Sequence, residues 1–434
     1  MKNKFPYRYR VLILLFFLIL VTYLDRVCIS LVGVRIKNEF NLSNTQFGWV
    51  VGAFALAYAL FEIPGGILGD RIGQRKVLIR IVLWWSLFTA LTGLTMGLVS
   101  LVIVRFLFGA GEAGAFPNGT GVISRWLPAV ETSKGISALF VGQSSGAALA
   151  PLMVVPLAAA YGWRAPFFAS GAIGLVWVFV CFIWFKNHPA EMKNISEKEK
   201  KFIENNRRFS LHTHSIAWKS FFKQRNIWLM MLAFFCAQWS LYFFVAWMPI
   251  YLQQGRHFTE SEMKMTTSFL FFCGIAGALS AGVINDWLVK KKGLKFGRRL
   301  MGFLALGMMS LLFFITAKTI SNNIASVALI ICYPFLPVFG TTAFSTCIDI
   351  GGNNSCTIAG VMNFAGSAGA FALSVLFGKI VDVTNNYNAP LFVIASVLIT
   401  GGFAWLGVNA EKKSRSEWKN IKQELSFAPA LIIE

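Results

Sequence analysis

The chain has 434 residues, of which 56% are hydrophobic and only 14% are charged, with 40 basic against 19 acidic side chains. A soluble domain carries about 25% charged residues, so this composition excludes an ordinary soluble protein and indicates a chain that lies mostly in lipid. The net charge of +21 would suit a nucleic-acid-binding protein, but the basic residues fall almost entirely between apolar runs, which indicates membrane orientation instead.

A membrane-spanning helix needs about 20 apolar residues, and the chain contains twelve such runs. They cover residues 11–33, 45–67, 77–98, 100–123, 135–158, 164–185, 226–252, 264–288, 299–317, 323–347, 355–380 and 389–409. We therefore expect an all-α membrane protein with twelve transmembrane helices. A hydrophilic linker at 187–225, whose end could lie as an amphipathic helix on the membrane, divides them into six-helix bundles at 1–186 and 226–410, and a tail follows at 411–434.

The distribution of basic residues predicts which end of each span lies on the cytoplasmic side of the membrane. If the N-terminus is cytoplasmic, that side receives 31 of the 40 Lys and Arg residues and the opposite side receives 7. Basic residues accumulate on the cytoplasmic side of membrane proteins. Both termini are therefore expected in the cytoplasm.

The first predicted span contains Tyr23, Asp25 and Arg26 about midway along its length. Tyr23 and Arg26 are three residues apart and share a helix face, whereas Asp25 points about 100° away from Arg26. Charged groups inside a span are costly and indicate functional sites. The guanidinium fork of Arg26 suits a carboxylate, so we expect it to anchor an anion.

Glu62 lies one turn beyond Tyr58 on the same face of the second span. Two interpretations remain open for it. It could be a third titratable group on a proton path, or it could bond neighbouring backbone near the cytoplasmic end. All four histidines fall in predicted loops, so any proton coupling must depend on carboxylates.

The segment after the second span has the sequence GILGDRIGQRK at residues 66–76. Its glycines would let helices approach, and its aspartate could accept charge-assisted bonds in one conformational state only. The expected gating residues are Gly66, Asp70, Arg71, Gly73 and Arg75. Gly66 and Asp70 recur 216 residues later as Gly282 and Asp286, and the following glycine and basic pair recur as Gly297, Arg298 and Arg299. This repetition indicates duplicated bundles with a site between them.

Arg105 and Glu112 lie seven residues apart in the fourth span, with Gly109 between them. Seven residues are two helical turns, so both side chains share one face. A buried arginine and carboxylate on one face usually mark an ion or proton path. A static ion pair that holds the bundle together is the alternative.

These features, together with Phe47-Gly48-Trp49, residues 58–66 and Phe116-Pro117, resemble the anion:cation symporter family of the major facilitator superfamily. The resemblance implies proton- or sodium-coupled movement of organic anions such as hexonates, hexuronates, sialic acid or aromatic acids. It implies proton-coupling roles for Asp25, Glu112 and Arg105. It also implies substrate contacts at Tyr23, Arg26, Tyr58, Gln143 and Asn363. The C-terminal half departs from the family pattern, since Ser367 and the segment 349–354 lack the usual residues.

We expect a transporter and not an enzyme, because no metalloprotease motif, phosphate-binding loop or nucleophile elbow is present. No cofactor or metal site is expected; the coupling ion would be a proton, with sodium as the alternative. The expected partners are a small organic anion and the lipid bilayer, for a protein that acts as a monomer. A short first outer loop, unlike that of animal relatives, favours a bacterial inner membrane. Rival functions are a proton-driven exporter, a drug-type antiporter, a siderophore or polycarboxylate transporter, and a transporter-like receptor.

Overall fold

The computed structural model describes residues 5–128, 131–192, 195–206, 223–351 and 355–411, and over these residues the chain forms helices and no strand. Eleven helical segments of the described chain are long and apolar enough to cross a membrane. The predicted third span forms α4 (Gln74–Thr92), which is 19 residues long but has Arg75, Lys76 and Arg80 in its first two turns. The number of twelve spans therefore stays a prediction.

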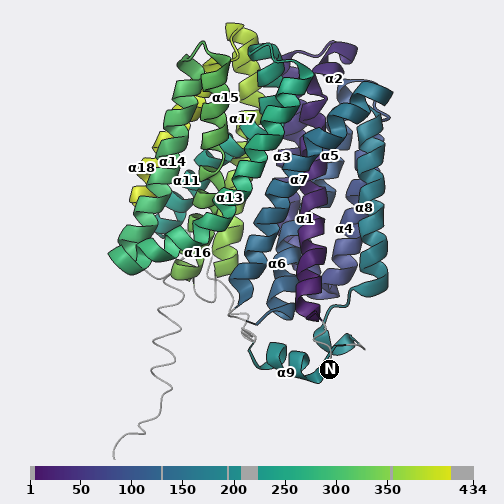
Figure 1. Ribbon diagram of the computed structural model, residues 1–434, viewed down its shortest axis with the longest axis vertical. Coiled ribbons are helices and arrows are strands. Elements are labelled where there is room, and N and C mark those ends of the chain that lie inside the picture. The colour runs from purple at the N-terminus through teal and green to yellow at the C-terminus, as the bar shows by residue number, and fades with distance from the viewer. Residues whose placement is uncertain (1–4, 129–130, 193–194, 207–222, 352–354, 412–434) are drawn as a thin grey trace, which may run out of the picture.

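The helices form two bundles that stand side by side (Figure 1). The N-terminal half contains α1 (Tyr7–Leu31), α2 (Gly33–Phe40), α3 (Asn44–Ile72), α4, α5 (Leu98–Glu112), α6 (Ala115–Trp126), α7 (Thr132–Tyr161) and α8 (Ala165–Trp184). The linker contributes η2 (Pro189–Glu191) and α9 (Glu197–Asn205). The expected amphipathic segment lies outside the described residues, apart from its last few positions.

The C-terminal half begins with a span that is not a regular α-helix. It consists of α11 (Arg225–Tyr242), a π-helical stretch η3 (Phe243–Trp247), α12 (Met248–Ile250) and a second π-helical stretch η4 (Tyr251–Gly255). Pro249 lacks an N–H and so leaves the carbonyl of Val245 without its helical donor. Ser30 of α1 donates to that carbonyl at 2.7 Å. The carbonyl group that the break leaves free is therefore hydrogen-bonded by a side chain of the other half.

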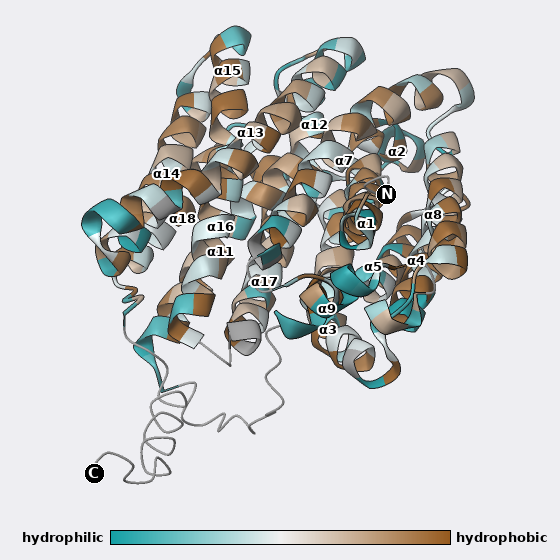
Figure 2. Ribbon diagram, turned by 60° about the horizontal axis from the view of Figure 1, so that its bottom comes forward, coloured by the Kyte–Doolittle hydropathy of each residue, from teal (hydrophilic) through white to brown (hydrophobic). Residues whose placement is uncertain are grey.

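The remaining helices of the second half are α13 (Glu260–Lys292), α14 (Leu294–Lys318), α15 (Asn322–Cys332), α16 (Phe335–Gly351), α17 (Ser355–Thr384) and α18 (Ala389–Leu406). Large apolar side chains such as Phe179, Val283 and Phe403 are 62–73% exposed on the outside of the bundles, which suits contact with lipid tails. Figure 2 shows hydrophobic positions along the helices and hydrophilic ones gathered at α9 and near the end of α14.

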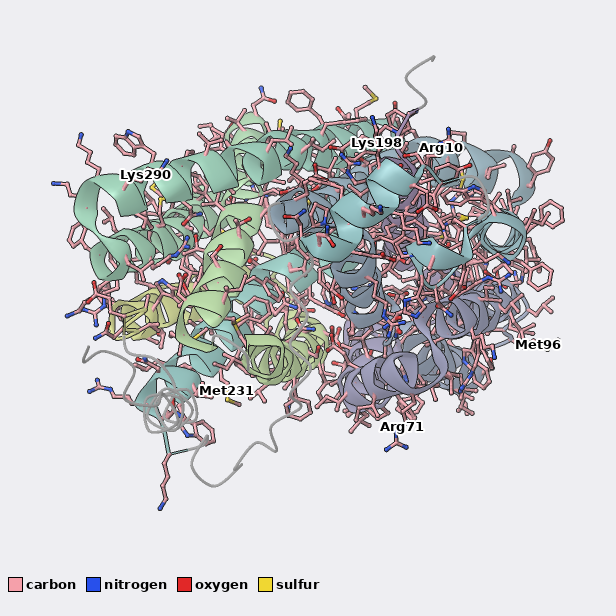
Figure 3. The ribbon with its side chains drawn as sticks, turned by 90° about the horizontal axis from the view of Figure 1, so that it is seen from below. Arg10, Arg71, Met96, Lys198, Met231 and Lys290 are labelled. Carbon is pink, nitrogen blue, oxygen red and sulfur yellow. The ribbon has the colours of Figure 1, made fainter. Side chains whose placement is uncertain are left out.

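The predicted gating segment is helical and not a loop. Gly66 and Arg71 lie in the last two turns of α3, and the chain turns at Gly73 alone, which has φ +91° and so suits glycine. Arg71 is exposed and points away from the bundle (Figure 3). The backbone N–H of Arg75 donates to Asn187 Oδ1 at 2.8 Å. The side chains of Asp70 and Asp286 lie outside what the structure describes.

The corresponding turn of the second half corrects one detail of the predicted repeat. The turn glycine between α13 and α14 is Gly293, with φ +83°. Gly297, the predicted counterpart of Gly73, lies inside α14, where a Cβ would meet Val289. Glycine spacing alone did not distinguish a turn from a close helix contact.

Several polar contacts join the halves at the end that carries α2, which we call the α2 end; the opposite end, near α9, is the α9 end (Figure 1). At the α2 end, Asp382 of α17 accepts hydrogen bonds from the backbone and side chains of Asn44 and Thr45 at 2.6–3.1 Å. Arg35 of α2 pairs with Glu260 of α13 at 2.8 Å. Carboxylates at helix N-termini are favourable, so Asp382 stabilises the start of α3.

Candidate functional site

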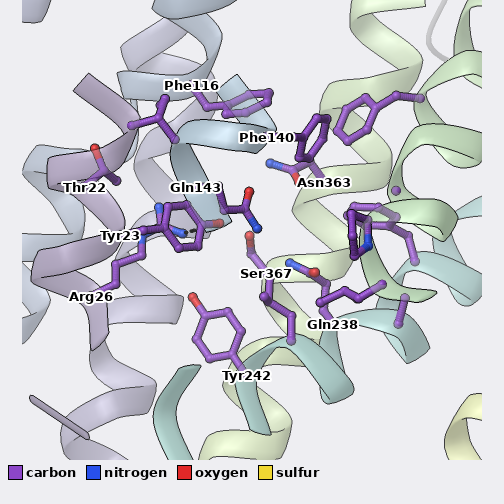
Figure 4. A pocket seen from close by; sticks show the side chains of 18 of the residues that line it. Thr22, Tyr23, Arg26, Phe116, Phe140, Gln143, Gln238, Tyr242, Asn363 and Ser367 are labelled. Carbon is purple, nitrogen blue, oxygen red and sulfur yellow. Dashed lines mark hydrogen bonds between the residues drawn. The ribbon is translucent and has the colours of Figure 1, made fainter. Parts of the chain in front are cut away.

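A cavity of about 100 Å³ lies between the two halves and is lined by residues from both. Figure 4 shows Tyr23 and Arg26 on the side of the N-terminal half, Gln238 and Ser367 on the side of the C-terminal half, and Gln143 between them. Ligand pockets typically enclose roughly 300–1,000 Å³. The cavity is therefore small in this conformation.

Arg26 is the only charged residue among those that line the cavity in the described chain. Its guanidinium pairs with Glu112 of α5 and lies 4.7–5.0 Å from the ring centres of Tyr23, Phe54 and Tyr58. Such cation–π contacts stabilise a desolvated cation. The sequence predicted that the guanidinium fork would be free for a ligand. In this conformation that prediction is wrong, because Glu112 occupies the fork.

Arg105 has a different environment from Arg26. It is 3% exposed, and its guanidinium carbon lies 4.5 Å from the ring centre of Phe108 and 5.2 Å from that of Phe54. Among the described residues it makes no ion pair, so the alternative of a static pair between Arg105 and Glu112 is not what the structure contains. Gly109 lets α5 pack closely against α3, since a Cβ at this position would collide with the carbonyl oxygen of Phe54.

Asp25 faces the interior of the N-terminal half, as the helical geometry predicted. It is 1% exposed, and its nearest polar neighbours include the hydroxyls of Thr89 on α4 and Ser170 on α8. Neither carboxylate oxygen makes a well-formed hydrogen bond within the described chain. A buried carboxylate in this state is costly when ionised. Glu112, in contrast, forms an ion pair with Arg26, a residue that lines the cavity.

Glu62 binds a side chain and not neighbouring backbone. It is 7% exposed on α3, and its Oε1 accepts a hydrogen bond from Nδ2 of Asn363 on α17. Its second oxygen, Oε2, has no partner within the described chain. The contact connects the two halves, and the interpretation that Glu62 bonds local backbone is wrong.

Of the predicted substrate contacts, Tyr23, Arg26, Tyr58, Gln143 and Asn363 all line the cavity. Gln238 and Tyr242 of α11 were not predicted from the sequence, and both line the cavity from the second half. Ser367, noted only as a departure from the family pattern, also contributes. An amide within an otherwise apolar run was the available signal for Gln238, because uncompensated polar groups are rare in spans.

Four phenylalanines close the cavity toward the α9 end, namely Phe116, Phe140, Phe234 and Phe344, with ring centres 5.9–6.4 Å apart in neighbouring pairs. Phe140, Phe234 and Phe344 each lie about two turns from the α9 end of their helices. Because both halves contribute, separation of the halves at this end would break the cluster.

At the α2 end a polar cluster connects the two halves. Lys37 of α2 donates to Asn44 and to Gln254 of η4, and Tyr387 donates to the same two residues at 3.0 and 2.6 Å. Burial lowers the pKa of Lys37 to about 8, although the carboxylate of Asp382 opposes this. The described residues hold no group of three or more His, Cys, Asp or Glu side chains that could bind a metal ion.

A sequence profile described as Major Facilitator Superfamily matches residues 15–374. The chain is 31% identical over 416 residues to a probable sulfoacetate transporter, SauU, of Cupriavidus necator, covering 94% of this chain and 95% of that protein. It is 28% identical over 401 residues to a probable L-galactonate transporter of Escherichia coli, covering 91% and 88%. A crystal structure of a bacterial homolog to the human lysosomal transporter Spinster, inward-facing and unoccupied, has a TM-score of 0.72 at 18% identity, covering 96% and 99%, and so shares the fold.

Proposed function

Because the chain belongs to the Major Facilitator Superfamily, whose members are transporters and not enzymes, we propose that it carries a small organic anion in symport with protons. A sugar acid or another carboxylate is the proposed substrate. Sulfoacetate and L-galactonate, named for two relatives, are both organic acids. Sulfoacetate has two acidic groups and galactonate has one, so the relatives leave the charge of the substrate open.

The observation that carries this proposal is that Arg26 is the single cation among the described residues that line the cavity between the halves. Arg26 lies where a ligand could reach both bundles, and its fork already binds a carboxylate, that of Glu112. An incoming organic acid presents the same group. The substrate would therefore replace Glu112 on Arg26 and accept hydrogen bonds from Tyr23, Tyr58 and Gln143, while its hydroxyls could donate to Oδ1 of Asn363.

Protonation of Glu112 provides the proposed coupling. An ionised Glu112 competes with the substrate for Arg26, whereas a protonated one does not, so substrate and proton favour the same state. Asp25 is the second proposed proton site, and Arg105, which the family resemblance assigns to proton coupling, would act on both carboxylates through its charge. The halves would then rock about the cavity, with Gly66, Asp70, Gly73 and Asp286 acting at the α9 end. The protein would act as a monomer.

A coupling experiment tests this function directly. Purified protein in proteoliposomes should accumulate a substrate acid under an inward proton gradient, with or without sodium. Asp25→Asn and Glu112→Gln should each lose accumulation, while substrate exchange without a gradient remains, because the neutral side chains cannot cycle a proton. Glu39→Gln is the matched control, since Glu39 pairs with Arg164 at the surface. If Asp25→Asn and Glu112→Gln both accumulated the acid at the parental level, these two residues would be excluded as proton carriers.

We further propose twelve spans with both termini in the cytoplasm, in a bacterial inner membrane. On this assignment the α9 end is cytoplasmic and the α2 end is external, as the basic residues predict.

Single cysteines at Asn41 and Asn205 test the orientation, because both positions are exposed and lie at opposite ends of the molecule. In intact cells an impermeant maleimide should label position 41 and should not label position 205, which should react only after lysis. The reverse pattern would invert the assignment.

A further inference from the structure

The cavity has a charged end and an uncharged end. Arg26 supplies the charge on the side of α1, and the residues that face it from the other side carry amides or hydroxyls: Gln143, Gln238, Asn363 and Ser367. A ligand whose carboxylate lies on Arg26 therefore extends toward these neutral groups. The charges of the residues behind these neutral side chains therefore determine which chemical group of the ligand this end of the cavity tolerates.

Glu62 stands behind Asn363. It is buried, it makes no ion pair within the described residues, and one of its oxygens has no partner there. Burial removes the solvent that would screen a charge, so an ionised Glu62 acts strongly on nearby groups. Asn363 donates its Nδ2–H to Oε1 of Glu62, and this bond offsets part of the cost of ionising a buried carboxylate.

This hydrogen bond also orients the amide of Asn363. Because Nδ2 points to Glu62, the carbonyl oxygen Oδ1 is the end that remains to accept a bond, and no described residue donates to it. A ligand hydroxyl can donate to this oxygen. A ligand carboxylate has no proton to donate, and it would meet both the carbonyl oxygen and the negative charge of Glu62.

We propose that Glu62 is a specificity-determining residue that restricts the cavity to acids with one anionic group and a hydroxyl-bearing far end. The inference rests on the proposed function, because it requires Arg26 to anchor the first carboxylate. Glu62 acts through charge and through Asn363, and it does not touch the ligand. Like-charge juxtaposition is an established means of rejecting wrong ligands.

The test uses two acids that differ only at the far end. D-Gluconate ends in a hydroxymethyl group and D-glucarate ends in a second carboxylate. Equilibrium binding to purified protein, without a proton gradient, keeps coupling out of the measurement. The parent should bind gluconate at least tenfold more tightly than glucarate. Glu62→Gln keeps an oxygen for Asn363 and removes the charge, and it should reduce this preference at least tenfold, mainly by tighter glucarate binding.

Glu39→Gln is the matched control, because it makes the same carboxylate-to-amide change on an exposed residue that pairs with Arg164 and does not line the cavity. It should leave the preference between the two acids within about threefold of the parent. A parental preference retained in Glu62→Gln, or a parent that binds both acids equally, would overturn the role of Glu62. Unchanged binding of both acids to Arg26→Ala would instead overturn the proposed function, and failure of every protein to bind either acid would overturn both.

Discussion

Replacing Arg26 with alanine is expected to abolish binding of organic anions in a protein that remains folded. A buried arginine in a span costs about 2.5 kcal/mol or more on insertion scales, so its removal should not by itself unfold the bundle. The variant does, however, leave Glu112 without its only ion-pair partner among the described residues. Arg26→Ala combined with Glu112→Gln removes both charges and separates loss of binding from loss of folding. Binding measured alongside thermal unfolding checks the result.

Lysine at position 26 separates bidentate recognition from simple charge. It keeps the positive charge but loses the fork and much of the planar stacking on Tyr23, Phe54 and Tyr58. We expect Arg26→Lys to bind substrate at least tenfold more weakly than the parent. Parental affinity in Arg26→Lys would exclude bidentate recognition. Parental affinity in the double variant of Arg26 and Glu112 would place the anion anchor elsewhere.

The sequence predicted this anchor because the relevant rules are local. A charged residue inside an apolar run is conspicuous, and helical periodicity alone places Tyr23 and Arg26 together and turns Asp25 away. The helical segments follow from the same argument, since run length and hydropathy determine which segments can cross a membrane. Tyr23 and Arg26 were therefore predictable from local rules, whereas the resemblance to a known family was needed for Tyr58 and Gln143.

The partners of these residues were not predictable, because they depend on contacts between distant helices. Arg105 and Glu112 share a helix face, yet Glu112 pairs with Arg26 on another helix. Glu62 finds Asn363 across the interface, 301 residues away in the chain. No spacing rule within one helix contains this information. The π-helical stretches around Pro249 also escaped prediction, since a proline indicates a break but not how the freed carbonyl is satisfied.

Closure of the α2 end depends on glycines that let helices of opposite halves touch. A Cβ at Gly378 of α17 would collide with the backbone carbonyl of Asn44, and one at Gly48 of α3 would collide with the backbone of Ser374. Backbone cannot move aside as a flexible side chain can. These two glycines are needed only while the α2 end is closed, because the contacts join different halves.

Gly378→Ala is therefore expected to shift the protein toward a conformation in which the α2 end is open. Overpacking costs about 1–3 kcal/mol, and a free energy of that size shifts a two-state equilibrium by roughly 5- to 150-fold. Ser374→Cys reports the shift in a background without the native cysteines, because Ser374 is fully buried in the closed conformation. Its labelling from the α2 end should rise by at least fivefold in Gly378→Ala.

Gly360→Ala on the same helix is the matched control, since a Cβ there meets nothing within 4 Å. It should leave labelling at position 374 unchanged. The added methyl group destabilises only the closed conformation, so Gly378→Ala should slow transport while each half stays folded. Substrate binding measured from the α2 side should persist. If labelling stayed at the parental level while the protein remained folded, the closed contact would tolerate the methyl group, and close backbone packing would not control this end.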